Sequence, residues 1–570
     1  MHRLTALVIS LALLVGLFVY APQSVRALEL APRYIGPGGG SGECGSPFYE
    51  TNGSADNVQF QTAVNDQDSD IDNILYVCPG TYDIDSWITV DGPLTIASVS
   101  GAANTILDAT ENAERIIGFM DDAEVIGLTF QNADVNWEGA AIYAGSSLTV
   151  RDSIFLNNHS DVEGGAIDFS GDEVAIVTGS TFIGNSAQEG GAINVDHDLD
   201  LVADSTFTDN ETTNGWGGAI LVVDDVYDKD VDGESGLIDN IFSNNSAEDS
   251  GGPVYVGSGG AVYVGDTFLN SDVSGNTFSG NMSHRNGGAL FVSGVFSGSL
   301  MSKNTFKGNA AGLNQDGGAF FLDARDGGAF FLDADFENGS QMIDNVFSGN
   351  TAGDDGGAVM LFWDMDEGTL ISGNTFSNNK ADLDNDNNGE GGGLQIDDWL
   401  GGTITNNRFL NNEAGYGGGL YSEDLTGTAV ITMNTFRSNV ATTDGGGIWL
   451  DDNGFDSSEL AIFTKNSFWG NRASDNGGAL YLSFTNTEVG PSFFTRNMYR
   501  GNRAALGGAI AFKGFGSVDV GEVAGDCSAP LTSSRIAVRI FKKDRFVSNR
   551  ATRSRRTANV GLMACEADLR

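Results

Sequence analysis

Residues 409–422 read FLNNEAGYGGGLYS, and residues 436–450 read FRSNVATTDGGGIWL. Each stretch contains a phenylalanine, an asparagine three residues later, and a glycine pair followed by a short apolar run. The aromatic–asparagine pair recurs from Phe155/Asn158 to Phe546/Asn549, mostly every 25–36 residues or so. A repeat of this length is typical of a solenoid or a propeller.

The residues after each glycine pair alternate between apolar and other side chains, as in Ile193-Asn194-Val195-Asp196. An alternation with period two indicates a β-strand and not a helix. We therefore expect each repeat to form one coil of a parallel β-helix. The phenylalanines would stack inside, the asparagines would form an amide ladder in turns that tolerate left-handed backbone, and the glycines would allow a sharp corner.

The units GGA[ILV] and FxxN resemble the repeats of the polymorphic outer-membrane protein family, within the pectin-lyase-like β-helix group. The resemblance covers roughly residues 130–550. It implies an all-β, right-handed parallel β-helix (solenoid), displayed outside the cell and often adhesive. Members that export themselves end in a membrane β-barrel of many alternating strands. Because this chain ends in CEADLR soon after its last repeat, we expect no autotransporter barrel.

The chain begins with a basic MHR, a long apolar run and a site that ends at Ala27. This pattern predicts a signal peptide over residues 1–27, with an uncleaved anchor helix as the alternative. Residues 28–82 would form an N-terminal cap and first strand, with a short capping helix over 55–64. Residues 83–525 would form the repeats, and 526–570 a C-terminal coil or cap with a basic segment. We expect no transmembrane segment after removal of the signal.

Four cysteines fit a secreted or cell-surface location, where disulfides persist. Four cysteines allow three pairings. We favour the two local disulfide bonds, Cys44–Cys78 and Cys527–Cys565, one at each end of the predicted solenoid.

The chain has 29 Lys and Arg residues against 77 Asp and Glu residues, a formal net charge of −48. Such acidity argues against nucleic acid or an anionic membrane as a partner, because phosphates would be repelled. One local anomaly is that DGGAFFLDA occurs at 316–324 and again at 326–334. Ten residues are too few for a coil, so one copy is predicted to loop out, and the sequence leaves open which.

Counted from the first glycine of each pair, the side chains at offsets three and five should face the core, and those at offsets four and six should face outward. Offset four then forms a largely aromatic column beside an acidic column at offset six. Aromatic rings can stack on sugars and carboxylates can accept hydrogen bonds from hydroxyl groups. The alternative is that loops or a second subunit cover the aromatic column, because long exposed apolar patches are rare. The predicted ligand-binding residues are Tyr263, Phe291, Gln395, Tyr421, Trp449 and Tyr481 at offset four and Asp397, Glu423 and Asp451 at offset six.

Two acidic turns resemble the first half of a calcium loop, in which alternate oxygens surround a hard cation and a glycine allows the turn. The first contains Asp228, Asp230 and Asp232 before Gly233, with Asp239 at the twelfth position. The second contains Asp384, Asp386 and Asn388 before Gly389. Ca²⁺ is the cofactor that these turns predict, and solvated acidic turns are the alternative.

These observations predict a non-enzymatic adhesion, glycan-binding or matrix protein. Its partner would be a polysaccharide or a host or cell-surface protein. The alternative is a secreted polysaccharide lyase or glycoside hydrolase of the pectin-lyase-like fold. No Ser/His/Asp arrangement is legible, and no carboxylate pair stands out as catalytic.

Overall fold

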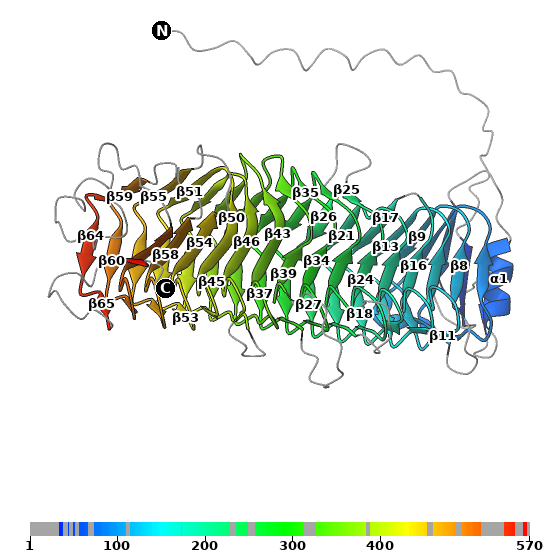
Figure 1. Ribbon diagram of the computed structural model, residues 1–570. Coiled ribbons are helices and arrows are strands. Elements are labelled where there is room, and N and C mark those ends of the chain that lie inside the picture. The colour runs from blue at the N-terminus through cyan, green and yellow to red at the C-terminus, as the bar shows by residue number, and fades with distance from the viewer. Residues whose placement is uncertain are drawn as a thin grey trace, which may run out of the picture.

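The computed structural model describes residues 33–37, 44, 49–51, 56–65, 73–109, 115–172, 174–227, 235–248, 257–312, 326–382, 388–452, 460–484, 493–514, 541–552 and 563–566. Within them, the chain winds into an elongated stack of short parallel strands (Figure 1). One coil consists of β16 (Ile167–Phe169), β17 (Ala175–Thr178), β18 (Thr181–Ile183) and β19 (Ser186–Ala187). Each of these strands pairs in parallel with its counterpart one coil further on. The predicted solenoid is confirmed.

Four kinds of sheet run along the stack. Sheet A has 18 strands, from β1 (Arg33–Pro37) to β63 (Phe541–Lys542). Sheet B has 16 strands, from β4 (Gly80–Asp83) to β64 (Arg545–Val547). The short strands of sheet D form one row of seven, from β11 (Asp134–Val135) to β38 (Ala310–Ala311), and one of five, from β49 (Glu413–Ala414) to β65 (Arg550–Ala551).

Sheet C includes the strands that follow the glycine pair of each repeat, and it positions the candidate site. Its main strands are β5 (Ile88–Val90), β8 (Ile117–Phe119), β12 (Ile142–Ala144), β16, β20 (Ile193–Val195), β24 (Ile220–Val222), β29 (Val262–Val264), β34 (Leu290–Val292), β39 (Phe330–Leu332), β43 (Val359–Met365), β46 (Leu394–Trp399), β50 (Leu420–Leu425), β54 (Ile448–Asp452), β58 (Leu480–Phe484), β62 (Ile510–Gly514) and β66 (Met563–Glu566). A second short row joins it, made of β25 (Val226–Tyr227), β30 (Phe268–Leu269), β35 (Phe296–Ser297) and β40 (Phe336–Glu337).

The repeated phenylalanines point inward from sheet B and stack along the axis of the solenoid. Phe155 and Phe182 have ring centroids 4.6 Å apart and nearly parallel planes. The stack continues coil by coil to Tyr499 and Phe546, whose centroids are 4.7 Å apart. Burying an aromatic ring in every coil supplies much of the hydrophobic stabilisation.

The asparagines three residues after the phenylalanines form the predicted amide ladder. Asn185 accepts hydrogen bonds from the backbone N–H and the side-chain amide of Asn158, and donates to Oδ1 of Asn210 at 3.0 Å. The expectation that these asparagines adopt the left-handed conformation is wrong. That conformation belongs to the preceding residue, such as Asn157 with φ 53°. A second ladder, through Asn240, Asn276 and Asn304, was not predicted.

The glycine pairs form a corner that excludes larger side chains. Gly190 has φ +58°, and a Cβ on Gly191 would lie 2.2 Å from the carbonyl oxygen of Gly218 in the next coil. Backbone from adjacent coils therefore meets at this corner without room for a methyl group.

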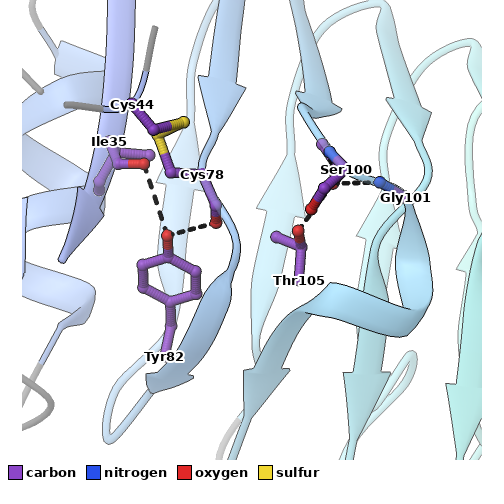
Figure 2. The surroundings of a disulfide bond; sticks show 8 residues. Ile35, Cys44, Cys78, Tyr82, Ser100, Gly101 and Thr105 are labelled. Atoms are coloured by element: carbon purple, nitrogen blue, oxygen red, sulfur yellow. Dashed lines mark hydrogen bonds between the residues drawn. A yellow bond between two sulfur atoms is a disulfide. The ribbon is translucent and has the colours of Figure 1, made fainter. Parts of the chain in front are cut away.

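The N-terminal end of the stack is capped by α1 (Asn57–Asn65), where the sequence predicted a helix. Phe60 of this helix packs edge-to-face on Tyr82, with ring centroids 5.2 Å apart. The predicted Cys44–Cys78 disulfide is present beside it, and the Tyr82 hydroxyl donates to the Cys78 carbonyl at 2.6 Å (Figure 2). Cys527 lies outside the described residues, so its bond to Cys565 remains a prediction.

The second copy of DGGAFFLDA supplies the glycine corner and the strand β39 of a regular coil. Phe330 of β39 lies in the core and Phe331 faces outward. The first copy lies outside the described residues. Among the helices that the structure describes, none has the length and apolar character needed to span a membrane.

Candidate functional site

We call the outward-facing residues at offset four on sheet C the outer row. Most side chains in this row are buried. Tyr421, Trp449 and Tyr481 are 3%, 9% and 3% exposed, and they form a cluster separate from the main core. The glycine corner of each coil folds back onto this row. A Cβ on Gly417 would lie 2.8 Å from Cβ of Tyr421. The expectation of an open aromatic column is therefore wrong, because the alternation fixes the face of a side chain but not what packs over it.

The rings of the outer row also stack on one another. Tyr421 and Trp449 lie 4.4 Å apart with planes 9° from parallel, so their faces meet across coils. Tyr263, which is half-buried, stacks on Phe291 at 4.9 Å. Phe291 is itself buried beside Phe331. The ring faces needed for stacking on a sugar are thus already occupied by neighbouring rings.

The residue before each glycine pair lies alongside the outer row, and we call these positions the corner row. Several of them are acidic. Oδ1 of Asp326 accepts the backbone N–H of Asp355 at 3.0 Å, and Oδ1 of Asp355 accepts that of Glu390 at 2.7 Å. Burial and the neighbouring carboxylates of Asp326 and Glu390 raise the pKa of Asp355.

A first acid–amide cluster lies on β16 and β20. Nδ2 of Asn194 lies 2.8 Å from Oδ1 of Asp168, 2.7 Å from Oδ1 of Asp196 and 3.3 Å from Oε2 of Glu163. Asp168 and Asn194 are fully buried, whereas Glu163 and Asp196 are half-buried. Burial, with a further contribution from nearby acids, raises the pKa of Asp168 to about 8 and that of Glu163 to about 7.

A second acid–amide cluster lies on β46 and repeats this pattern. Nε2 of Gln395 donates to Oδ1 of Asp397 at 3.0 Å and lies 3.2 Å from Oε2 of Glu390. Burial raises the pKa of Glu390 to about 8, although its hydrogen bond to Tyr421 opposes this, and burial raises the pKa of Asp397 to about 7. The neighbouring Glu423 is exposed. Both amides lie in the motif E-G-G-x-x-[NQ]-x-D, at 189–196 and 390–397, whose glutamate the offset analysis did not include. Gln395 contacts the glutamate of its own motif, whereas Asn194 contacts Glu163 of the preceding coil.

Exposed aromatic side chains flank these clusters at positions that the repeat did not indicate. Trp87 is 43% exposed, and the guanidinium of Arg115 lies 5.1 Å from its ring and 4.7 Å from that of Tyr143. On β43, Phe362 and Trp363 are 38% and 51% exposed. The offset rule missed them because Trp87 precedes a strand without a glycine pair, and β43 extends beyond its repeat with a register shift.

The other predicted site residues are less informative. Asp228, Asp230, Asp232, Asp384 and Asp386 lie outside the described residues, and the side chain of Asp451 is not described either. Asp239 is in a turn with φ 54°, and Asn388 is exposed. The two calcium loops therefore remain predictions.

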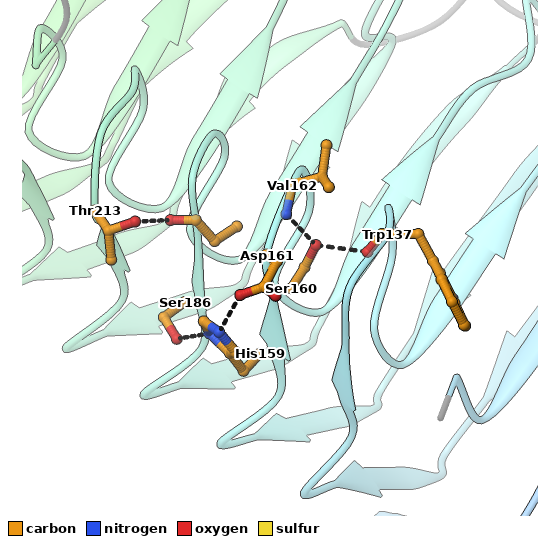
Figure 3. Close-up of polar contacts among 8 residues, drawn as sticks. Trp137, His159, Ser160, Asp161, Val162, Ser186 and Thr213 are labelled. Atoms are coloured by element: carbon orange, nitrogen blue, oxygen red, sulfur yellow. Dashed lines mark hydrogen bonds and ion pairs between the residues drawn. The ribbon is translucent and has the colours of Figure 1, made fainter. Parts of the chain in front are cut away.

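His159 and His197 contact residues outside the acid–amide clusters. The ring of His159, on sheet D, lies between the hydroxyl of Ser186 at 2.8 Å and the carboxylate of Asp161 at 3.3 Å (Figure 3). His197 contacts Asp172 at 2.8 Å and Asp224 at 3.4 Å. Apart from Ser186, the partners are the exposed carboxylates of Asp161, Asp172 and Asp224, an arrangement that is common on protein surfaces.

No curated protein matches the chain. Solved structures that resemble it include a mannuronic acid specific polysaccharide family 6 lyase from human gut microbiota, at 11% identity and a TM-score of 0.33, covering 79% of this chain and 83% of that one. The catalytic domain of Agl-KA matches at 11% identity and a TM-score of 0.21, covering 90% of this chain and 66% of that one. A PL6 alginate lyase in complex with a trisaccharide matches at 11% identity and a TM-score of 0.21, covering 91% and 96%.

At 11% identity and TM-scores of 0.33 and 0.21, these structures do not indicate an activity for this chain.

The family model described as "Right handed beta helix region" matches residues 323–468. The match includes coils in which the phenylalanine stack and the asparagine ladder are continuous, from Phe347 to Phe468 and from Asn350 to Asn439. The chain is a right-handed parallel β-helix.

Proposed function

We propose that this is a secreted or cell-surface polysaccharide-binding protein, and that the saccharide lies along the outer face of sheet C. The observation that carries the proposal is the row of half-buried and exposed carboxylates on this face, flanked by exposed aromatic residues. Glu163, Asp196 and Asp397 are half-buried, and their carboxylates offer hydrogen-bond acceptors at the surface. The neighbouring Glu423 is exposed and offers a further one. Trp87 and Trp363 offer exposed indole surface on the same sheet.

The rigidity of the scaffold favours an extended ligand. Sheet C is continuous through parallel pairing from β5 to β66, so its outward side chains are held at fixed spacing. A site built on such preorganised strands loses little conformational entropy on binding. Saccharides are complementary to this face, because their hydroxyl groups can donate hydrogen bonds to carboxylates and their apolar ring faces can contact aromatic side chains.

A second candidate is a glycoside hydrolase on the same face. Glu390, with a pKa of about 8, would be protonated at neutral pH, as a general acid must be. The exposed Glu423 nearby could act as the carboxylate partner. Binding without turnover would favour the first proposal, whereas release of reducing ends would favour the second.

The proposal is tested by binding the purified chain to an array of acidic and neutral polysaccharides. We expect a saccharide to bind, and we expect Trp87→Ala and Trp363→Ala each to weaken its affinity by about 10-fold or more. Trp469→Ala is the matched control, since Trp469 is also exposed, at 40%, but lies on sheet B. Binding that is unchanged in both sheet C variants, or lost in the control alone, would contradict the proposal.

A further inference from the structure

Three carboxylates converge around the amide of Asn194. Glu163, Asp168 and Asp196 each present a carboxylate oxygen, and these oxygens all lie within 4.8 Å of one another. Glu163 and Asp168 come from one coil, and Asp196 comes from the next. The other carboxylate oxygen of Asp196 accepts a hydrogen bond at 2.7 Å from Ser170, which belongs to the first coil. The strands of sheet C therefore fix these oxygens in a small volume.

The hydrogen bonding at this position is incomplete. Nδ2 of Asn194 has three carboxylate oxygens within 3.3 Å, but an amide nitrogen carries only two hydrogens. Oδ1 of Asn194 and Oδ2 of Asp168 have no hydrogen-bond partner, and both residues are 0% exposed. Leaving buried polar atoms unpaired costs about 1–3 kcal/mol each, so a ligand that bound these oxygens would remove an existing penalty.

Rotating the Asn194 amide by half a turn would exchange its oxygen and nitrogen, which have nearly the same shape. Oδ1 would then lie about where Nδ2 lies now, which is 2.8 Å from Oδ1 of Asp168, 2.7 Å from Oδ1 of Asp196 and 3.3 Å from Oε2 of Glu163, so four oxygens would share one small volume. That arrangement is repulsive by itself but suits a hard cation. Ca²⁺ lies about 2.4 Å from each oxygen ligand, so it fits between oxygens up to about 4.8 Å apart.

The protein offers this cluster little positive charge of its own. Among the described residues, no lysine, arginine or histidine lies within ion-pair distance of Glu163, Asp168 or Asp196. The nearby Arg115 stacks on Trp87 and Tyr143, and it donates to the backbone carbonyls of Gly139 and Glu138. Its guanidinium is thus held beside the cluster and does not enter it.

We propose that Glu163, Asp168, Asn194 and Asp196 form a Ca²⁺ site on the outer face of sheet C, separate from the two predicted calcium loops. The three carboxylates hold the ion, and the rotated Asn194 amide adds its oxygen. The ion ties two consecutive coils together across sheet C. This site goes beyond polysaccharide binding and does not depend on it.

The test uses the full chain stripped with EDTA and dialysed, then titrated with CaCl₂ by calorimetry and melted with and without Ca²⁺. Asp168→Asn keeps the size of the side chain and removes one ligand charge. Asp204→Asn is the control, because Asp204 lies in the coil of Asn194 and Asp196, is exposed and has φ 50°, which asparagine also tolerates. Glu163→Gln, at a half-buried position, serves if Asp168→Asn does not fold.

We expect Ca²⁺ to raise the melting temperature of the wild-type chain and of Asp204→Asn. We expect Asp168→Asn to bind Ca²⁺ about 100-fold more weakly and to lose the shift, while its melting temperature in EDTA is at least that of the wild type. Equal affinity in Asp168→Asn and wild type would overturn the proposal. So would an absence of binding in the wild type, or binding that is lost only in the combined variant Asp228→Asn, Asp230→Asn and Asp232→Asn.

Discussion

The side-chain amide of Asn245 donates to Oδ1 of Asn281, one coil further along the stack, at 3.0 Å. The same Asn281 oxygen accepts the backbone N–H of Asn245, and the Asn245 amide also donates to the carbonyl of Phe207. Each ladder asparagine therefore links three successive coils. Because the ladder is buried, these bonds do not compete with water.

The ladder predicts that two adjacent asparagines differ sharply in their effect on stability. Replacing Asn245 by Ala would leave several buried polar groups without partners, and we expect a loss of about 2–5 kcal/mol in the free energy of unfolding. Asn244 is exposed and has φ 55°, so Asn244→Gly should change it by less than about 0.5 kcal/mol. Denaturant unfolding of both variants measures the difference, and equal effects would contradict the role of the ladder.

The glycine corner predicts a second contrast. Gly191→Ala would place a Cβ 2.2 Å from the Gly218 carbonyl oxygen, and we expect it to cost about 3 kcal/mol or more. Gly308 has φ +63°, but a Cβ there would meet nothing within 4 Å, so Gly308→Ala should cost only the left-handed strain of about 1–2 kcal/mol. Thermal unfolding compares the two. A milder effect at Gly191 than at Gly308 would show that the corner can relax.

The raised pKa values predict that stability without calcium falls as the pH rises. Glu390 and Asp397 have pKa values of about 8 and about 7 in the folded chain, against about 4 when unfolded. Between pH 4 and 8 the folded chain retains protons that the unfolded chain has released, so the stabilisation is complete below about pH 4 and is lost through about pH 8. In EDTA we expect a lower melting temperature at pH 8 than at pH 5.

Two variants separate this effect from the general repulsion of an acidic chain. Glu390→Gln should flatten the pH dependence, because it removes a buried titrating group. Glu413→Gln removes the same charge at an exposed position and should leave the slope close to that of the wild type. Identical slopes in the two variants would contradict the assignment to Glu390.

The duplicated segment gives a prediction about tolerance to deletion. Because residues 326–334 supply the glycine corner and the core residue Phe330, removing residues 316–325 leaves a complete repeat in the sequence. We expect the shortened chain to fold with a melting temperature within a few degrees of the wild type. A circular dichroism melt checks this, and loss of cooperative unfolding would show that the first copy is needed.

The sequence predicted the stack well because its determinants are local and repeated. Phe182 and Asn185 recur at fixed separation, and each contacts its own counterpart in the next coil. The second ladder through Asn240 was equally readable, two residues before each phenylalanine, but its earlier coils have serines such as Ser205, which weakened the signal.

The candidate site was harder to predict because its geometry depends on how the corners pack. Alternation placed Tyr421 and Trp449 on the outer face, but only the structure shows the glycine corner folded over them. The buried acids arise from the meeting of two coils, since Asp168 and Asn194 come from different repeats. Spacing within one repeat contains no information about that contact.

The central claim, that a saccharide binds along the outer face of sheet C, is tested most directly by hydroxyl-radical footprinting of the wild-type chain with a saturating oligosaccharide. The account predicts that oxidation of Trp87 and Trp363 falls severalfold, while oxidation of Trp469 on sheet B is unchanged. Protection of Trp469 alone, or no protection of the two sheet C tryptophans under conditions where binding is measured independently, would contradict it.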